Sequence, residues 1–122
     1  IKTTKTIQKQ IKKGEISGVI LFGKNIKSKE DLIKLNEKFI SLNPITPFVA
    51  IDNEGGMIQR HKFFNNLSAK DVSNMTEDEA KIEYENMAKS LQELKINLNF
   101  APVVDLELNE KSIISKKKRS NK

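Results

Sequence analysis

The apolar run Phe48–Ile51 constrains the fold most, because it ends abruptly at Asp52 and is soon followed by Gly55 and Gly56. Such a run is typical of a buried parallel strand that leads into a loop at the edge of a sheet. A carboxylate there is costly to desolvate, so Asp52 is either a loop cap or a ligand contact. Arg60 can turn back toward Asp52, since the intervening glycines allow backbone angles that other residues resist.

Apolar runs and amphipathic segments alternate along the rest of the chain. The spacing predicts helices over residues 3–13, 28–42 and 76–94, and strands over residues 16–22, 48–51 and 96–100. Between residues 53 and 75 no period persists, and we expect a long loop with room for a helical turn.

This order predicts right-handed crossovers onto a parallel sheet with helices on at least one face. An open doubly wound sheet and a closed (β/α)8 barrel both fit. Both place ligands at the carboxyl ends of strands, where Asn25, Asp52 and Asp105 fall.

Composition limits the chain to one modest soluble domain. The 122 residues are 37% hydrophobic and 31% charged, and no apolar run approaches the roughly 18 residues of a membrane span. Zero cysteines and a single histidine make a protein-built metal site improbable, so we expect no cofactor, no metal and no membrane partner. Without a recognisable signal we expect a cytoplasmic protein, while a periplasmic or secreted one stays open if a segment precedes Ile1.

The net charge of +6 comes mostly from a basic tail at residues 116–122. Residues 1–115 carry 17 basic and 16 acidic side chains, so the body is nearly neutral. No aromatic residues are interleaved with the tail, which favours a solvated segment over a nucleic-acid interface.

Three blocks in this order resemble the amino-terminal catalytic domain of glycoside hydrolase family 3. They are GVILFGKNI at residues 18–26, AIDNEGGMIQR at residues 50–60 and LKINLNFAPVVD at residues 94–105. The most similar branch is the bacterial β-N-acetylhexosaminidases, which trim N-acetylglucosamine from cell-wall fragments. The resemblance spans roughly residues 14–119. It implies a partial TIM-type (β/α)8 barrel, with about three parallel strands and covering helices in residues 1–115.

The resemblance also implies a carbohydrate substrate and three sugar-binding residues. Asp52 would accept hydrogen bonds from sugar hydroxyls, and Arg60 would donate to ring substituents. Arg119 matches an arginine of the family's Arg-Ser-Phe segment. Because the match ends there, Arg119 as a sugar contact and Arg119 as part of a solvated tail both stay open.

Several positions depart from the family's pattern. His61 stands where leucine is usual, and we expect it to be an exposed loop residue, not a catalytic one. Lys95 ends a helix where the family tends to use glycine, and a left-handed conformation there would cost on the order of 1 kcal/mol. Glu54 is given a loop-building role by the resemblance, not a catalytic one.

No residue of this sequence is predicted to be catalytic. The family's nucleophilic aspartate follows a later strand, and the hexosaminidase branch uses a histidine on a downstream loop as acid/base. We therefore predict a truncated part, inactive alone, of an enzyme that hydrolyses terminal β-linked N-acetylglucosamine with retention. The alternative is a small non-enzymatic α/β module that binds a ligand or nucleic acid through Asp52, Arg60 and the basic tail. The sequence does not indicate an oligomeric state.

Overall fold

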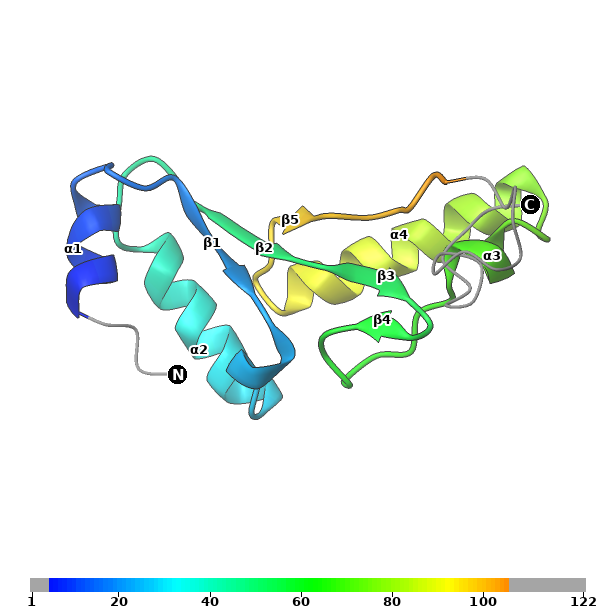
Figure 1. The fold of residues 1–122 in the computed structure, drawn as a ribbon, viewed down its shortest axis with the longest axis horizontal. Helices are drawn as coiled ribbons and strands as arrows, with labels where there is room; N and C mark the ends of the chain where they lie inside the picture. The colour runs from blue at the N-terminus through cyan, green and yellow to red at the C-terminus, as the bar shows by residue number, and fades with distance from the viewer. Residues whose placement is uncertain (1–4, 106–122) are drawn as a thin grey trace.

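The computed structural model describes residues 5–105, in which helices and strands alternate (Figure 1). In chain order the elements are α1 (Lys5–Lys12), β1 (Gly18–Leu21), the 3-10 helix η1 (Gly23–Asn25), α2 (Lys29–Ile40), β2 (Phe48–Ile51), β3 (Asn53–Gly55), β4 (Ile58–Gln59), α3 (Ala69–Val72), α4 (Glu77–Glu93) and β5 (Leu98–Asn99). The alternation follows the predicted order, with a hairpin and a short helix added between β2 and α4.

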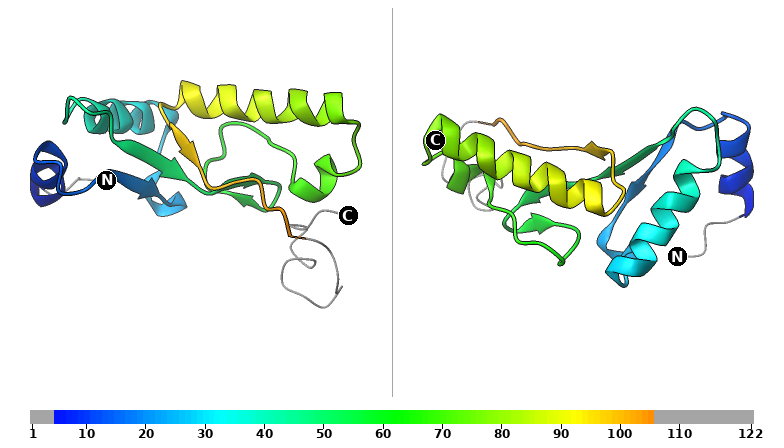
Figure 2. Two further views of the ribbon diagram at one scale, coloured as in Figure 1. Left: turned by 90° about the horizontal axis from the view of Figure 1, so that it is seen from above. Right: turned by 180° about the vertical axis from the view of Figure 1, so that it is seen from behind.

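Three of the strands form a parallel sheet in the order β1-β2-β5. Gly18 pairs with Phe48 and Leu21 with Ile51, and β2 joins β5 through residues that include Ala50. The helix α2 returns the chain to β2, and α4 returns it to β5, as parallel pairing requires. Figure 2 shows α2 and α4 along the same side of these strands. The predicted α/β fold, with about three parallel strands and covering helices, is confirmed.

The hydrophobic core lies between the sheet and its helices. Val49 and Ile51 of β2 are fully buried there, and burial of such a side chain stabilises the fold by about 1.5–3 kcal/mol. The buried cluster comprises Ile11, Leu21, Leu32, Phe39, Val49, Ile51, Met87, Leu91, Leu94 and Ile96. Asn36 adds a polar link, because its Nδ2 donates to the Leu94 carbonyl at 2.8 Å and so joins α2 to the end of α4.

The opposite face of the sheet carries large apolar side chains that no described helix covers. Side chains alternate along a strand, so Ile20 and Phe48 point away from the buried Val49. Ile20 is 42% exposed and Phe48 is 54% exposed. Phe22 and Phe100, just beyond the carboxyl ends of β1 and β5, are similarly exposed. In a closed barrel this face would be the interior.

Three helices begin at a side-chain cap. Ser28, Ser68 and Thr76 each accept a hydrogen bond from the backbone N–H three residues further on. The helices predicted over residues 28–42 and 76–94 begin at the Ser28 and Thr76 caps, whereas no helix start was predicted at the Ser68 cap of α3, which pairs reciprocally with Asp71. Lys95 has φ 58 at the end of α4, so it adopts the left-handed conformation whose cost was considered above.

A hairpin occupies residues 53–59, where a loop was predicted. Its strands pair antiparallel, with Asn53 opposite Gln59 and Gly55 opposite Ile58 in an irregular register. Gly55 and Gly56, with φ 80 and φ 54, make the turn. Strands of two and three residues are too short to show an alternating pattern, so the loop prediction was wrong here while its helical turn corresponds to α3.

Element bounds differ from the predicted ranges by a few residues. The outer strands, at residues 18–21 and 98–99, are shorter than the strands predicted at residues 16–22 and 96–100. Within residues 5–105, no helix has the length and apolar character needed to cross a membrane. The predicted tail at residues 116–122, which includes Arg119, lies outside the described residues.

Candidate functional site

The structure brings Asp52 and Arg60 together at the carboxyl end of β2. Asp52 is the first residue after β2, and Arg60 follows β4 on the returning arm of the hairpin. Arg60 Nη2 donates to Asp52 Oδ2 at 3.1 Å, with the two side chains 35% and 27% exposed. The predicted return of Arg60 toward Asp52 is confirmed, and the glycine turn of the hairpin is what allows it. A half-exposed pair of this kind contributes little to stability.

The guanidinium of Arg60 is only partly satisfied. Its Nε is buried and has no hydrogen-bond acceptor among the described residues. A buried donor without an acceptor costs free energy of about 1–3 kcal/mol, which a ligand oxygen or a water molecule would recover. The Arg60 side chain therefore combines a fixed contact to Asp52 with a buried donor that has no acceptor among the described residues.

An amide side chain from the neighbouring strand fixes the backbone next to Asp52. Asn99 of β5 accepts from the Asn53 backbone N–H at 2.9 Å and donates through Nδ2 to the Asn53 carbonyl at 3.0 Å. Both backbone groups of residue 53 are thus satisfied by one side chain. The Phe100 N–H also donates to the Ile51 carbonyl at 2.9 Å, so β5 holds the chain on both sides of Asp52.

Two more amides continue from Asn53 to the residue before Arg60. Asn53 Nδ2 donates to Asn66 Oδ1 at 3.0 Å, and the Asn66 N–H donates to Gln59 Oε1 at 3.1 Å. Gln59 Nε2 donates in turn to the carbonyls of His61, at 3.2 Å, and of Phe64. We refer to Asn99, Asn53, Asn66 and Gln59 as the amide relay. No sequence pattern predicts the amide relay, because amides scattered over more than 40 residues follow no period.

His61 corrects a prediction, because it is buried and not an exposed loop residue. Its ring is only 1% exposed, stacked on Phe63 at 6.1 Å between centroids and edge-on to Phe64 at 5.8 Å. Neither ring nitrogen has a hydrogen-bond partner among the described residues, and burial lowers the pKa of His61. Gln59 Nε2 donates to the carbonyls of residues 61 and 64, and these two hydrogen bonds hold the backbone of residues 61–64 in place around the ring. The leucine usual at this position in the family was the signal for a buried side chain.

The remaining candidates add no second polar centre. Glu54 is buried within β3, which agrees with a structural role in the hairpin. Asn25 caps η1, since its Oδ1 accepts from the Phe22 N–H at 2.9 Å. Among residues 5–105 no cluster of three His, Cys, Asp or Glu side chains could hold a metal ion. The third predicted sugar contact, Arg119, lies outside the described residues.

A parallel sheet covered by helices, with a carboxylate and a guanidinium paired at the carboxyl end of its second strand, is the arrangement of a TIM-type α/β domain, which binds its ligands at that end of the strands. Comparison with known proteins identifies the family within this class. Residues 1–120 match the glycosyl hydrolase family 3 N terminal domain, and the chain belongs to this family.

Curated relatives of this chain are named beta-hexosaminidases. The chain is 32% identical over 106 residues to a beta-hexosaminidase of Shewanella frigidimarina (strain NCIMB 400), covering 80% of this chain and 31% of that protein. A beta-hexosaminidase of Xanthomonas campestris pv. campestris (strain B100) is 28% identical over 108 residues, covering 80% and 32%. The chain thus spans about a third of the length of these relatives.

Solved structures agree on the fold. NagZ from Neisseria gonorrhoeae, crystallised in complex with zinc ion, superimposes with a TM-score of 0.79 at 25% identity, covering 98% of this chain and 38% of that one. A glycoside hydrolase family 3 beta-N-acetylglucosaminidase from Paenibacillus sp. str. FPU-7 gives a TM-score of 0.80 at 22% identity, covering 91% and 22%. The predicted partial TIM-type barrel is therefore confirmed.

Proposed function

We propose that this chain forms part of the sugar-binding mouth of a β-N-acetylhexosaminidase. The whole protein would hydrolyse terminal β-linked N-acetylglucosamine, from cell-wall fragments or related glycosides, with retention and through a covalent glycosyl intermediate. The Asp52–Arg60 pair at the carboxyl end of β2 carries the proposal, because this edge of a TIM-type barrel is where substrates bind. Relatives named beta-hexosaminidase support the class of substrate.

The two side chains offer complementary chemistry to a sugar. The Asp52 carboxylate is an acceptor only, suited to hydroxyl donors, and Arg60 is a donor only, suited to hydroxyl and carbonyl oxygens. Hydrogen bonds to charged groups contribute about 1.5–3 kcal/mol each, more than bonds between neutral groups. Asp52, Arg60 and Arg119 are therefore the proposed substrate-binding residues, and none of the three is assigned a catalytic step.

His61 takes no part in this proposal. A general acid/base must reach the reacting atoms by a hydrogen bond, directly or through one water molecule. The His61 ring is enclosed by Phe63 and Phe64 and is almost fully buried. We assign it to the packing of the loop.

Asp52→Asn tests the proposal in the 122-residue chain by titration with N-acetylglucosamine, followed by 1H–15N chemical shifts. Loss of one charged hydrogen-bond acceptor is expected to weaken binding by about tenfold to a hundredfold. The shifts that move in the wild-type chain should lie around residues 52–60. Unchanged affinity in Asp52→Asn would contradict the proposal.

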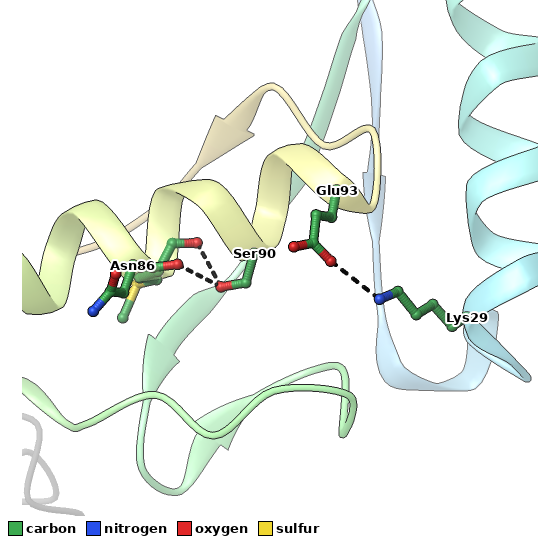
Figure 3. A network of polar contacts seen from close by, with 5 residues as sticks. Lys29, Asn86, Ser90 and Glu93 are labelled. Atoms are coloured by element: carbon green, nitrogen blue, oxygen red, sulfur yellow. Dashed lines mark hydrogen bonds and ion pairs between the residues drawn. The ribbon is translucent and has the colours of Figure 1, made fainter.

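Glu93→Gln is the matched control for this substitution. Glu93 also pairs with a cation at 3.1 Å, the Lys29 Nζ, which links α2 to α4 (Figure 3) and lies 4.7 Å from the centre of the Phe64 ring. The substitution removes the same kind of ion pair without altering Asp52 or Arg60, and N-acetylglucosamine affinity should stay within about twofold, as expected for an exposed pair. Salt-dependent DNA binding that is lost on deleting residues 116–122 would instead favour the non-enzymatic alternative.

A further inference from the structure

The hairpin that carries Arg60 has little backbone support of its own. β4 has two residues, its register with β3 is irregular, and two consecutive glycines with positive φ, Gly55 and Gly56, lie at the turn. Isolated two-stranded hairpins are marginal in water. The position of Arg60 relative to Asp52 therefore depends on contacts other than the β3–β4 pairing.

The amide relay supplies those contacts, from the parallel sheet to the hairpin. It starts at Asn99 on β5, grips the backbone of Asn53 next to Asp52, crosses to Asn66 and ends at Gln59, next to Arg60. Asn53 is 0% exposed and Asn66 is 5% exposed, so water competes little for these bonds. The Asn53–Asn66 bond, which is buried, is thus strengthened by a low local dielectric.

Gln59 is the decisive member, because its amide holds both sides of the segment after Arg60. Its Oε1 accepts from the Asn66 N–H, and its Nε2 donates to the carbonyls of His61 and Phe64. The backbone that follows Arg60 is therefore held at residues 61 and 64. Backbone carbonyls cannot donate, so only a side chain with an N–H at this position can satisfy both of them.

We propose that the amide relay preorganises the Arg60 guanidinium for the sugar, with Gln59 as its positioning residue. The inference rests on the proposed function, since the ligand of Arg60 is the N-acetylglucosamine unit. A guanidinium already held beside Asp52, with its Nε buried and unpaired within the described chain, loses little freedom when a ligand oxygen binds. Gln59 touches no substrate atom in this scheme and acts through Arg60.

Gln59→Glu tests this in the 122-residue chain, because it preserves shape and the Oε1 acceptor but removes the Nε2 donor. The readout is hydrogen exchange of the Arg60 Nε–H, seen directly by 1H–15N spectroscopy. The chain has two arginines, so Arg119→Lys identifies the Arg60 signal. We expect about tenfold faster exchange in Gln59→Glu, since losing a buried bond shifts local opening by that order.

Asn66→Asp is the matched control. It introduces the same negative charge in the same network, yet keeps the Oδ1 acceptor for Asn53 Nδ2 and its own backbone N–H. Exchange at Arg60 Nε should stay within about twofold of wild type, because the relay bonds survive. If Gln59→Glu does not fold, Gln59→Met serves instead, as an uncharged side chain of similar length that also lacks the donor.

A sugar titration separates this inference from the proposed function. Slower Arg60 exchange in wild type than in Gln59→Glu, with about tenfold weaker N-acetylglucosamine binding in the variant, supports the inference. Unchanged exchange in both Gln59 variants overturns it, whatever the sugar does. Faster exchange with unchanged sugar affinity overturns the preorganisation as well. If the wild-type chain binds no N-acetylglucosamine, but Arg60 Nε–H exchange is still faster in the Gln59 variants than in wild type, the proposed function fails and the positioning of Arg60 by Gln59 stands.

Discussion

His61 is the side chain whose environment differs most from its expected one, and its burial has a consequence for stability. Burial lowers the pKa of His61 below the ordinary 6.5, so the unfolded chain binds a proton more readily than the folded chain. The unfolding free energy must then fall as the pH drops through about 6.5 toward the folded pKa. One such group contributes a slope of at most about 1.4 kcal/mol per pH unit.

His61→Leu isolates this effect, because it keeps an apolar side chain beside Phe63 and Phe64 without a titrating group. We expect the variant to gain stability relative to wild type as the pH falls from 7.5 to 5, measured by urea unfolding monitored by circular dichroism. Every other titrating group is shared by the two proteins, so it cancels in the difference. A difference that stays constant over this range would show that His61 titrates normally in the folded chain.

Single residues were predictable where the chemistry was local. Asp52 ends an apolar run and Arg60 follows two glycines, and these neighbours in sequence were enough to predict their encounter. The amide relay was not predictable in this way, because Asn99 meets Asn53 only after β5 has been placed beside β2. The contacts of the amide relay depend on which residues of β2 and β5 lie opposite each other, and a single sequence does not specify this register.

At the scale of elements, the hairpin is the part most sensitive to a single methyl group. A Cβ on Gly55 would lie 1.9 Å from the Leu67 carbonyl oxygen, and φ is 80 there. We expect Gly55→Ala to lower the unfolding free energy by about 3 kcal/mol or more, since unfavourable backbone angles and overpacking cost 1–3 kcal/mol each. Urea unfolding measures the loss, and the Asp52–Arg60 contact should be lost with the hairpin.

Gly14→Ala is the control for backbone strain alone. Gly14 has a similar φ of 71, but the nearest atom to a Cβ there is Asn43 Nδ2 at 4.0 Å. The substitution should cost only about 1 kcal/mol, the usual penalty for a left-handed position. Equal losses in the two variants would mean that the Leu67 backbone gives way, and that the hairpin is not packed as tightly as the structure indicates.

Elements were predictable in proportion to their length and their end signals. The spacing of apolar residues predicted α2 and α4 within a few residues, and each helix begins at a side-chain cap, Ser28 or Thr76. The hairpin and the outer strands depend instead on pairing between distant segments. β5 keeps only two paired residues where a strand of five, residues 96–100, was predicted, because pairing with β2 sets its length.

At the scale of the whole molecule, the two faces of the sheet differ sharply. One face is buried under α2 and α4, and the other presents Ile20, Phe48 and Phe100, half exposed, together with Phe22. Within the described residues, β1 and β5 each have one hydrogen-bonded neighbour, so both are edge strands. Contiguous apolar surface next to open edges is what a partial barrel exposes, and such surfaces promote association.

Substitution on each face in turn tests this view of the molecule. Phe48→Ser combined with Phe100→Ser removes two exposed rings. We expect the double variant to bind less of the dye 8-anilinonaphthalene sulfonate and to self-associate less, as measured by light scattering. Its unfolding free energy should stay within about 1 kcal/mol of the wild-type value. Phe39→Ala removes one ring from the covered face, where the side chain is buried, and should cost about 3–5 kcal/mol. The contrast follows because a ring stabilises a fold only to the extent that folding removes it from water. If the double substitution destabilised the chain as much as Phe39→Ala does, the open face would be covered in solution by a second copy of the chain. Unfolding would then depend on the protein concentration.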